Sequence, residues 1–364
     1  MDLQDLLDDL GALVNVESPS QDVEALAKSA AMIAEVMEHR LGSRPALVDS
    51  AAGPHVHWSG RGTPQVLIVG HHDTVFPLGA IAQRPFTVAD GRATGPGVFD
   101  MKGGIVQAIH AVASLPDRSG VEMLFTSDEE VGSGASRALI EERAQACGSV
   151  LVLEPSADGG ALKVGRKGTG TFEVIVHGRA SHAGLEPEKG VNSLVAAAEL
   201  IGQIATFGDP GTGTTVTPTM ATAGTADNVV PAETRVRVDV RVVEPAETSR
   251  IDALMAALQP SLDGATVEIR GGFNRPPMHE SAAADLFPLA QRAAVATDVA
   301  PMNGVAVGGG SDGNFTAALG IPTLDGLGAV GGGAHADAEH LLVDHMVPRA
   351  RLLAALIDEI RQRR

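Results

Sequence analysis

Three short apolar runs in the first half of the chain each end in acidic or histidine residues, and this repeated ending most constrains the fold. Apolar runs of this length that alternate with helical patterns are typical of a mainly parallel sheet covered by helices on both faces. Such a doubly wound sheet places its ligand crevice outside the carboxyl ends of its strands, so polar groups far apart in sequence are expected to converge there. The runs are 65–69, 121–127 and 150–153, and they lead into Gly70-His71-His72-Asp73, Asp128-Glu129-Glu130 and Glu154-Pro155.

The pattern of the chain changes between about residues 168 and 270. Strand-like alternation runs over 171–176 and 234–240, around a helical pattern at 191–206. This mixture predicts an inserted α+β domain at 168–272, whose edges coincide with stretches rich in glycine and proline that suit linkers, 165–168 and 271–277. The remaining residues, 1–167 and 273–364, are expected to form the α/β domain with the doubly wound, mainly parallel sheet.

The charge balance excludes some classes of partner. The chain has 27 Lys and Arg against 45 Asp and Glu, which gives a formal net charge of −18, and aromatic residues make up only 3%. Such a balance attracts neither a phosphate backbone nor an anionic membrane surface, and nucleic-acid bases would find few aromatic side chains to stack on. We therefore expect neither nucleic acid nor a membrane as a partner.

The start of the chain and its cysteine usage indicate a compartment. Residues 1–13 place leucines at helical spacing among four aspartates, which predicts an amphipathic helix and not a signal peptide. No apolar run approaches the ~18 residues of a membrane span. Cys147 is the single cysteine of the sequence, so no disulfide is expected within the chain, and a buried apolar thiol is expected at that position. These features predict a cytoplasmic protein.

The histidines and acids of the chain have the donor types of a two-metal site. Nitrogen and oxygen donors without sulfur bind zinc, and cobalt or manganese as substitutes. A site for two ions needs about six or seven donors, one of which bridges the ions. Each residue alone is a weak indication, because solvated loop acids are common, but as a set they predict a dinuclear site. The set is His71, His72, Asp73, Asp100, Asp128, Glu129, Glu130, Glu154 and His335.

Several ordered motifs make the chain similar to a known family. They are GHHDTV at 70–75, GPGVFDMKGG at 95–104, SDEEVGS at 127–133, Glu154-Pro155 and GAH at 333–335. Together they resemble the co-catalytic zinc amidohydrolases, the family of glutamate carboxypeptidase, acetylornithine deacetylase and succinyl-diaminopimelate desuccinylase. The resemblance extends over essentially the whole chain, including the inserted domain, and is greatest to the glutamate carboxypeptidase-like members.

The resemblance implies a role for each residue at the predicted metal site. Asp73 is expected to accept the other N–H of the ligand His71 and so to fix its tautomer, which the chemistry of metal-bound histidine also predicts. Glu129 is implied as the general base that deprotonates the attacking water and passes the proton to the leaving amine. The implied ligands of two zinc ions are Asp100 as the bridge, His71 and Glu154 on one ion, and Glu130 and His335 on the other.

The inserted domain and a late glycine-rich loop carry the residues implied for substrate. GRASHAG at 178–184 resembles the lid motif of the family, which implies that His182 polarises the scissile carbonyl in the partner subunit of a homodimer. Asn228 and Arg241 match positions that hold the substrate carboxylate, and a guanidinium binds a carboxylate through two hydrogen bonds. The loop 308–313 is implied to line the carboxylate and leaving-group pocket, with Gly310 and Ser311 as donors.

Three other histidines are expected to lie outside the site. His72 occupies the variable position between His71 and Asp73, so we expect it to be non-essential. His55 alternates with His57 on one strand pattern, and both are expected to be half-exposed strand residues.

These expectations combine into a hydrolase. The sequence predicts a homodimeric dizinc enzyme that cleaves an amide bond next to a free carboxylate in a small N-acyl or peptidyl amino acid, with a glutamate-like preference. The family resemblance leaves a biosynthetic N-acyl amino acid deacylase as an alternative, such as acetylornithine deacetylase or succinyl-diaminopimelate desuccinylase. A non-hydrolytic metal-bound binder is disfavoured, because it would be expected to lack the base or a ligand, and Glu129 and all five ligand positions are present.

Overall fold

The computed structural model describes residues 1–363, and the chain divides into two compact units. Unit 1 comprises residues 1–165, 278–307 and the chain from Ser311 onward. Unit 2 comprises Arg166–Pro277 together with Gly308–Gly310. The chain therefore leaves unit 1 after Gly165, returns at Met278, and contributes three further glycines to unit 2.

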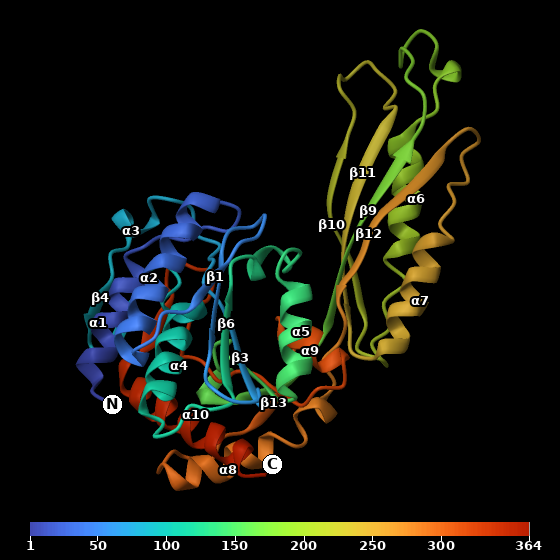
Figure 1. The fold of residues 1–364 in the computed structure, drawn as a ribbon. Coiled ribbons are helices and arrows are strands. Elements are labelled where there is room, and N and C mark those ends of the chain that lie inside the picture. The colour runs from blue at the N-terminus through green and yellow to red at the C-terminus, as the bar shows by residue number, and fades with distance from the viewer. Residues whose placement is uncertain (364) are drawn as a thin grey trace. The chain divides into compact units, whose positions relative to one another are not determined.

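The centre of unit 1 is a six-stranded sheet with the order β1-β2-β6-β3-β7-β14 (Figure 1). Four neighbouring strands, β6, β3, β7 and β14, are parallel, whereas β2 and β1 join the edge antiparallel. The mainly parallel sheet predicted from the sequence is thus confirmed. The strands are β1 (Ala46–Val48), β2 (His55–Ser59), β3 (Val66–His71), β6 (Val121–Thr126), β7 (Val150–Val152) and β14 (Thr323–Leu324).

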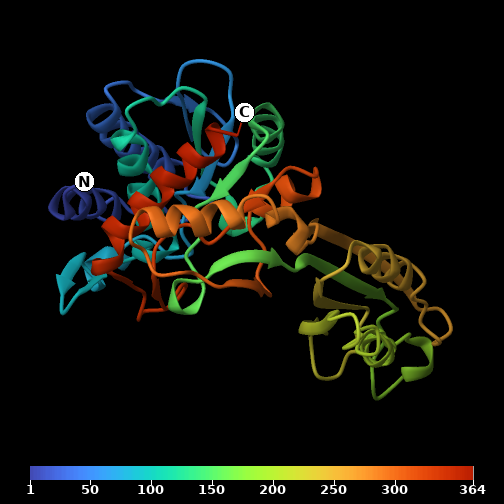
Figure 2. The same ribbon diagram turned by 90° about the horizontal axis from the view of Figure 1, so that it is seen from below.

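Helices cover both faces of this sheet because its central strands are apolar on both sides. Along β3, Val66 and Ile68 belong to one buried cluster, whereas Leu67 and Val69 belong to another. The larger cluster includes residues of α1, α2, α4, α8 and α10, and the smaller one includes residues of α5. α8 packs along α10 (Figure 2). The bounds are α1 (Leu3–Val14), α2 (Val23–Leu41), α4 (Gly103–Ser114), α5 (Arg137–Cys147), α8 (Phe287–Ala296), α9 (Gly313–Ala318) and α10 (Met346–Arg361).

The amphipathic helix predicted at 1–13 is present as α1, with Asp2 as its N-cap. The Asp2 side chain accepts a hydrogen bond from the backbone N–H of Gln4, which satisfies one donor at the helix start. Cys147 at the end of α5 is buried, as expected. No helix within residues 1–363 combines the length and the apolar character that crossing a membrane requires.

Smaller elements complete unit 1. One four-stranded sheet has the order β15-β16-β5-β4, and a two-stranded sheet pairs β13 with β8. The strands are β4 (Thr87–Ala89), β5 (Arg92–Thr94), β8 (Leu162–Arg166), β13 (Gly304–Val307), β15 (Gly331–Gly332) and β16 (His340–Leu342). The short helices are α3 (Ala80–Gln83), η1 (Val98–Lys102), η2 (Glu129–Val131), η3 (Asp158–Gly160), η5 (Glu280–Ala283) and η6 (Val343–His345).

Unit 2 is a four-stranded antiparallel sheet with two helices on one face (Figure 1). The sheet order is β10-β11-β9-β12, so β10 and β12 are its edges. Apolar residues alternate along β11, and Val236, Val238, Val240 and Val242 pack into one buried cluster with both helices. The bounds are β9 (Gly168–His177), η4 (Pro187–Lys189), α6 (Ser193–Ile204), β10 (Thr215–Ala223), β11 (Glu233–Val242), α7 (Pro245–Ala256) and β12 (Thr266–Arg275).

The stretch 271–277 is not the irregular linker that its composition predicts. Gly271 and Gly272 lie inside β12, which continues to Arg275 in antiparallel pairing with β9. Both glycines have positive φ angles, 83° and 141°, and the pairing shifts register between Phe273 and Arg275. The glycines therefore allow an irregular strand to remain paired, a use of glycine that composition alone does not separate from a linker.

Candidate metal centre

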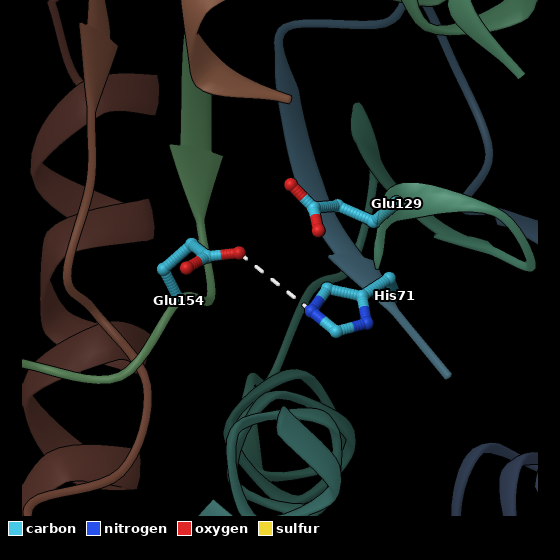
Figure 3. Close-up of side chains that lie close together, drawn as sticks. All are labelled: His71, Glu129 and Glu154. Carbon is cyan, nitrogen blue, oxygen red and sulfur yellow. Dashed lines mark ion pairs between the residues drawn. The ribbon is translucent and has the colours of Figure 1, made fainter. Parts of the chain in front are cut away.

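The parallel strands of unit 1 bring the predicted histidine and acids to one edge of the sheet. His71 is the last residue of β3 and pairs with Thr126, the last residue of β6, while Val69 pairs with Val152 at the end of β7. Glu129 and Glu130 follow β6 in η2, and Glu154 follows β7. Figure 3 shows His71, Glu129 and Glu154 close together, with an ion-pair contact of 3.7 Å between His71 Nε2 and Glu154 Oε1.

Asp100 faces the two predicted histidine ligands with different oxygens. Its Oδ1 lies 3.3 Å from His71 Nε2, and its Oδ2 lies 3.4 Å from His335 Nε2. His335 Nε2 also lies 3.1 Å from Glu130 Oε1. A carboxylate with one oxygen toward each of two histidines has the arrangement required of a bridge between two metal ions.

Two overlapping triplets of donor atoms are close enough to hold ions. One consists of His71, Glu129 and Glu154, and the other of His71, Asp100 and Glu130, with the donor atoms of each triplet within 4.8 Å of one another. Glu129 thus lies among the donors, and its expected role as a base has to be distinguished from that of a ligand. The two triplets contain Glu129 and four of the five predicted ligands, and the fifth, His335, contacts Asp100 and Glu130.

Asp73 makes more contacts than its predicted role requires. His71 Nδ1 lies 3.0 Å from the backbone carbonyl oxygen of Asp73, its hydrogen-bond acceptor, and the Asp73 carboxylate lies 3.4 Å from the same nitrogen. The carboxylate also accepts hydrogen bonds from the backbone N–H groups of Glu129 (3.1 Å) and Glu130 (3.2 Å) and from Ser20 Oγ (2.8 Å). Burial alone would raise the pKa of Asp73, but hydrogen bonding and charge attraction from His71 lower it. One buried carboxylate therefore fixes both a histidine and the loop of the two glutamates.

The shifted pKa values of the cluster show that its carboxylates stabilise positive charge. Burial would raise the pKa of Asp100, yet hydrogen bonds from His335 and His71 lower it below its usual range. The pKa of His335 rises to about 10 because of its hydrogen bonds to Asp100 and Glu130. Burial would lower the pKa of His71, but Asp100 and Asp73 raise it well above its usual value. In the absence of metal, the histidines thus act as counter-ions to the carboxylates.

The donor set fits two divalent cations. Asp100, Glu129, Glu130 and Glu154 bring four carboxylates to a partly buried place that holds two imidazoles, so cations are needed to balance the charge. Asp100 Oδ1 is buried, and its contact with His71 Nε2 at 3.3 Å leaves a lone pair of this oxygen for a metal. The donors are nitrogen and oxygen only, which suits zinc, cobalt or manganese.

Of three histidines near the site, His55 differs from expectation. His55 is buried and not half-exposed, because its ring packs under the loop that follows β6, with Nδ1 2.9 Å from Ser127 Oγ. His57 is partly buried and lies 3.1 Å from Glu122. His72 points away from the other donors, with Nε2 3.2 Å from the carbonyl of Pro54, and burial lowers its pKa to about 4.

Two residues near the metal ligands were missed by sequence reasoning. Glu339 is buried, and its carboxylate accepts hydrogen bonds from three backbone N–H groups of the segment that carries Asp100. An acid four residues after the predicted ligand His335 was the available signal. Ser20, which donates to Asp73, lies 53 residues before it, and nothing in its local sequence indicates the contact.

In unit 2, His182 and Asn228 lie side by side. The loop 178–190 pairs with the segment before β11: His182 bridges to Val229, and Ala183 N donates to Asn228 O at 2.9 Å. His182 is exposed, and its Nδ1 accepts hydrogen bonds from the N–H groups of Gly184 (3.1 Å) and Leu185 (3.2 Å). In the neutral ring the proton is therefore on Nε2, which leaves an N–H donor for a ligand.

Arg241 lies toward the opposite end of the same sheet. It is eight residues after Glu233 on β11, which corresponds to about 26 Å at ~3.3 Å per residue, and Asn228 precedes that strand. The Arg241 guanidinium is partly exposed and binds the Asp239 carboxylate through two hydrogen bonds, of 3.0 and 2.8 Å. Asn228 and Arg241 of one chain are thus too far apart to bind the same carboxylate.

The structure does not support Ser311 as a substrate donor. Its side chain is fully buried, its Oγ donates to Asp325 Oδ2 at 2.7 Å, and its backbone N–H donates to Asn314 Oδ1 at 2.8 Å. Both the hydroxyl and the backbone N–H of Ser311 thus donate to residues of the protein, so Ser311 stabilises the conformation of the loop. Gly310 belongs to unit 2, where its carbonyl accepts a hydrogen bond from Arg166 at 3.2 Å.

Comparison with known proteins gives consistent matches along the chain. The profile of peptidase family M20/M25/M40 matches residues 67–359. Carboxypeptidase G2 from Pseudomonas sp. (strain RS-16) is 32% identical and covers 95% of this chain and 86% of its own. Succinyl-diaminopimelate desuccinylase from Xanthomonas oryzae pv. oryzae (strain MAFF 311018) is 31% identical over 99% of both chains. The M20 family metallo-carboxypeptidase Sso-CP2 from Sulfolobus solfataricus has a similar fold, with a TM-score of 0.79 at 18% identity over 99% of both chains.

These matches agree with the arrangement of the chain. The family profile spans most of the sequence and includes His71, Asp100, Glu129, Glu130, Glu154 and His335. The family expected from the sequence motifs is therefore confirmed. The chain belongs to peptidase family M20/M25/M40 and is a hydrolase of peptide or amide bonds.

Proposed function

We propose that this protein is a dizinc carboxypeptidase-like hydrolase that releases a glutamate-like amino acid from a small N-acyl or peptidyl substrate. The observation that carries the proposal is the position of Asp100, whose two oxygens face His71 and His335. His71 and Glu154 would complete the ligands of one ion, and Glu130 and His335 those of the other. Cobalt or manganese would be tolerated by the same donors.

The residues of this chain supply the proton transfer. Two bound divalent ions supply Lewis acidity and lower the pKa of water toward neutrality. Glu129 lies beside the donors of His71 and Glu154, and its backbone is held by Asp73, so its carboxylate is positioned to take a proton from the attacking water. The same carboxylate then returns the proton to the leaving amine.

Arg241 is the proposed binder of the substrate carboxylate. A guanidinium keeps its charge at any physiological pH and forms two parallel hydrogen bonds with a carboxylate. Carboxypeptidase G2, similar over 95% of this chain, supports a substrate with a free carboxylate next to the cleaved bond. A deacylase that acts on an N-acyl diamino acid is the second candidate, favoured by the desuccinylase match over 99% of both chains.

A substrate panel tests the proposed function. The metal-loaded protein is assayed with N-acylglutamates, plain dipeptides, N-acetylornithine and N-succinyl-diaminopimelate, and kcat/KM is measured for each. We expect the highest kcat/KM for the N-acylglutamates. Activity confined to N-acetylornithine or N-succinyl-diaminopimelate would establish the deacylase instead, and no hydrolysis of any of them would contradict both.

Replacing Arg241 by alanine is expected to raise KM for carboxylate substrates by at most about 10- to 100-fold, since a charged hydrogen-bonded contact contributes ~1.5–3 kcal/mol and Asp239 competes for the same guanidinium. Because the contact exists before and during reaction, kcat should change little. Steady-state kinetics on an N-acylglutamate measure both constants. Arg237→Ala, an exposed arginine on the same strand, is the control and should leave KM unchanged. An unchanged KM in the Arg241 variant would remove this residue from the site.

We further propose that the protein works as a homodimer in which unit 2 is the dimerisation and lid domain. Its edge strand β10 is mostly exposed and includes Met220, which is 62% exposed. Leu194 and Val195 expose apolar surface on the adjoining helix α6. An exposed edge strand beside apolar helix residues is suited to pairing with a second copy. In such a dimer, His182 of one chain would serve the site of the other.

We also propose that the protein works in a reducing compartment, specifically the cytoplasm. The support is that Cys147 is the single cysteine of the sequence and is buried at the end of α5. Such cysteine usage is ordinary where thiols are kept reduced.

A further inference from the structure

The carboxylate of Glu339 anchors a segment of backbone next to the proposed metal centre. Its Oε2 accepts the N–H of Gly97 at 2.9 Å, and its Oε1 accepts the N–H groups of Phe99 at 3.0 Å and Asp100 at 2.9 Å. The residue is 1% exposed. Three short hydrogen bonds to one buried carboxylate form a strong, charge-assisted contact.

The segment that Glu339 binds cannot hold itself in place as a regular helix. Asp100 and Met101 have non-helical backbone angles, and α4 begins only at Gly103, so no helical carbonyl accepts the N–H groups of Phe99 and Asp100. Gly97 has a φ of 72°, and a Cβ there would lie 2.6 Å from Thr74 Cγ2. The backbone N–H groups of Gly97, Phe99 and Asp100 therefore need an acceptor from elsewhere in the chain, and the Glu339 carboxylate is that acceptor.

Glu339 is also joined to the ligand His335 through a short loop. The N–H of Ala336 donates to Gly333 O, and the N–H of Glu339 donates to Ala336 O, each at 3.0 Å. Residues 333–338 are otherwise exposed, and His335 adopts a positive φ of 63°. Glu339 is the buried residue at the end of this loop, so it fixes where the loop returns to the protein.

We infer that Glu339 is a positioning residue that sets the bridging ligand Asp100 and the ligand His335 relative to each other. One side chain thereby controls two of the three proposed ligands of the ion bound by Asp100, Glu130 and His335. It controls only one ligand of the other ion, because His71 ends the central strand β3 and Glu154 follows β7. The inference rests on the metal centre of the proposed function and predicts unequal effects on the two ions.

Glutamine is the informative replacement at this position. It keeps the size of the side chain and one acceptor oxygen, which can still serve Phe99 and Asp100. The amide NH2 group would then face the N–H of Gly97, so that two donors oppose each other and the charge is lost. Alanine removes all three hydrogen bonds and leaves buried N–H groups unpaired, which is destabilising in itself.

The test is metal binding measured apart from catalysis. The apo forms of wild type, Glu339→Gln, Glu339→Ala and the control Asp337→Asn are titrated with Co²⁺ and followed by visible absorption and equilibrium dialysis. Asp337 lies on the same loop with its side chain 97% exposed. For Glu339→Gln we expect the ion at the Glu130 and His335 site to bind about 10- to 100-fold more weakly, which is the usual effect of removing a residue that orients a metal ligand. The absorption band of this ion should change as well. Binding of the ion at the His71 and Glu154 site should weaken less, and the control should match wild type.

Circular dichroism and thermal unfolding of the apo proteins check folding, and if Glu339→Ala does not fold, the glutamine variant decides. Equal weakening of both ions in Glu339→Gln, or no weakening, would overturn the inference. The proposed function fails separately, when wild type itself binds fewer than two Co²⁺ per chain. It also fails when wild type with both ions hydrolyses none of the panel substrates.

Discussion

The Glu129→Gln variant is expected to lose about 10²- to 10⁴-fold in kcat, the usual contribution of a general base, while both metal ions stay bound. Glutamine keeps the shape of the side chain but cannot accept a proton from water at neutral pH. The backbone N–H of Glu129 would still donate to Asp73, so the loop should keep its conformation.

Metal content per chain and steady-state kinetics, measured on the same samples, test the two roles open to Glu129. Glu130→Gln serves as the comparison and should lose metal, because Glu130 lies 3.1 Å from His335 and is a proposed ligand. Glu142→Gln changes an exposed acid of α5 and should behave as wild type. If Glu129→Gln loses one ion, Glu129 is a ligand, as its place in the triplet with His71 and Glu154 allows.

The His182→Ala variant is expected to be nearly inactive alone and to regain activity when mixed with Glu129→Gln chains. Removing one donor to a developing oxyanion typically costs about 10²- to 10³-fold in kcat. If His182 acts in the partner's site, a mixed dimer has one complete site, formed by the Glu129 of one chain and the His182 of the other. With random exchange of subunits, the mixture should recover about a quarter of wild-type activity.

The exchange experiment distinguishes action in the partner from action within one chain. The two variants are unfolded together, refolded and assayed, and each variant treated alone is the control. A mixture no more active than the sum of its parts would contradict action in the partner site. Size-exclusion chromatography with light scattering checks the dimer independently.

The convergence at the sheet edge was predictable from sequence because it follows from parallel pairing. Strands that run in the same direction end at the same edge, so His71, Glu129 and Glu154 had to approach one another once their runs were identified as neighbouring strands. The pairing of Asp100 with two histidines was available only through the family resemblance, since no strand of the central sheet carries Asp100 or His335.

Other features could not be predicted, because they depend on tertiary contacts between distant segments. His55 is buried by the loop at Ser127, 72 residues later, and its own strand pattern gives no sign of this. The glycine-rich loop predicts Ser311 as a donor to substrate, but Asp325 and Asn314 accept hydrogen bonds from both of its donor groups. The glycines at 271 and 272 have the composition of a linker but the pairing of a strand.

The hydrogen bonds between Arg241 and Asp239 would make the proposed binding of substrate by Arg241 an exchange. A carboxylate that reaches the guanidinium has to displace Asp239 or share the arginine with it. The net gain is the difference between two similar contacts, so a lone carboxylate such as acetate gains little, whereas a substrate held elsewhere as well can shift the balance. Asp239 thus orients the Arg241 guanidinium and, in the proposed function, would compete with simple anions for it.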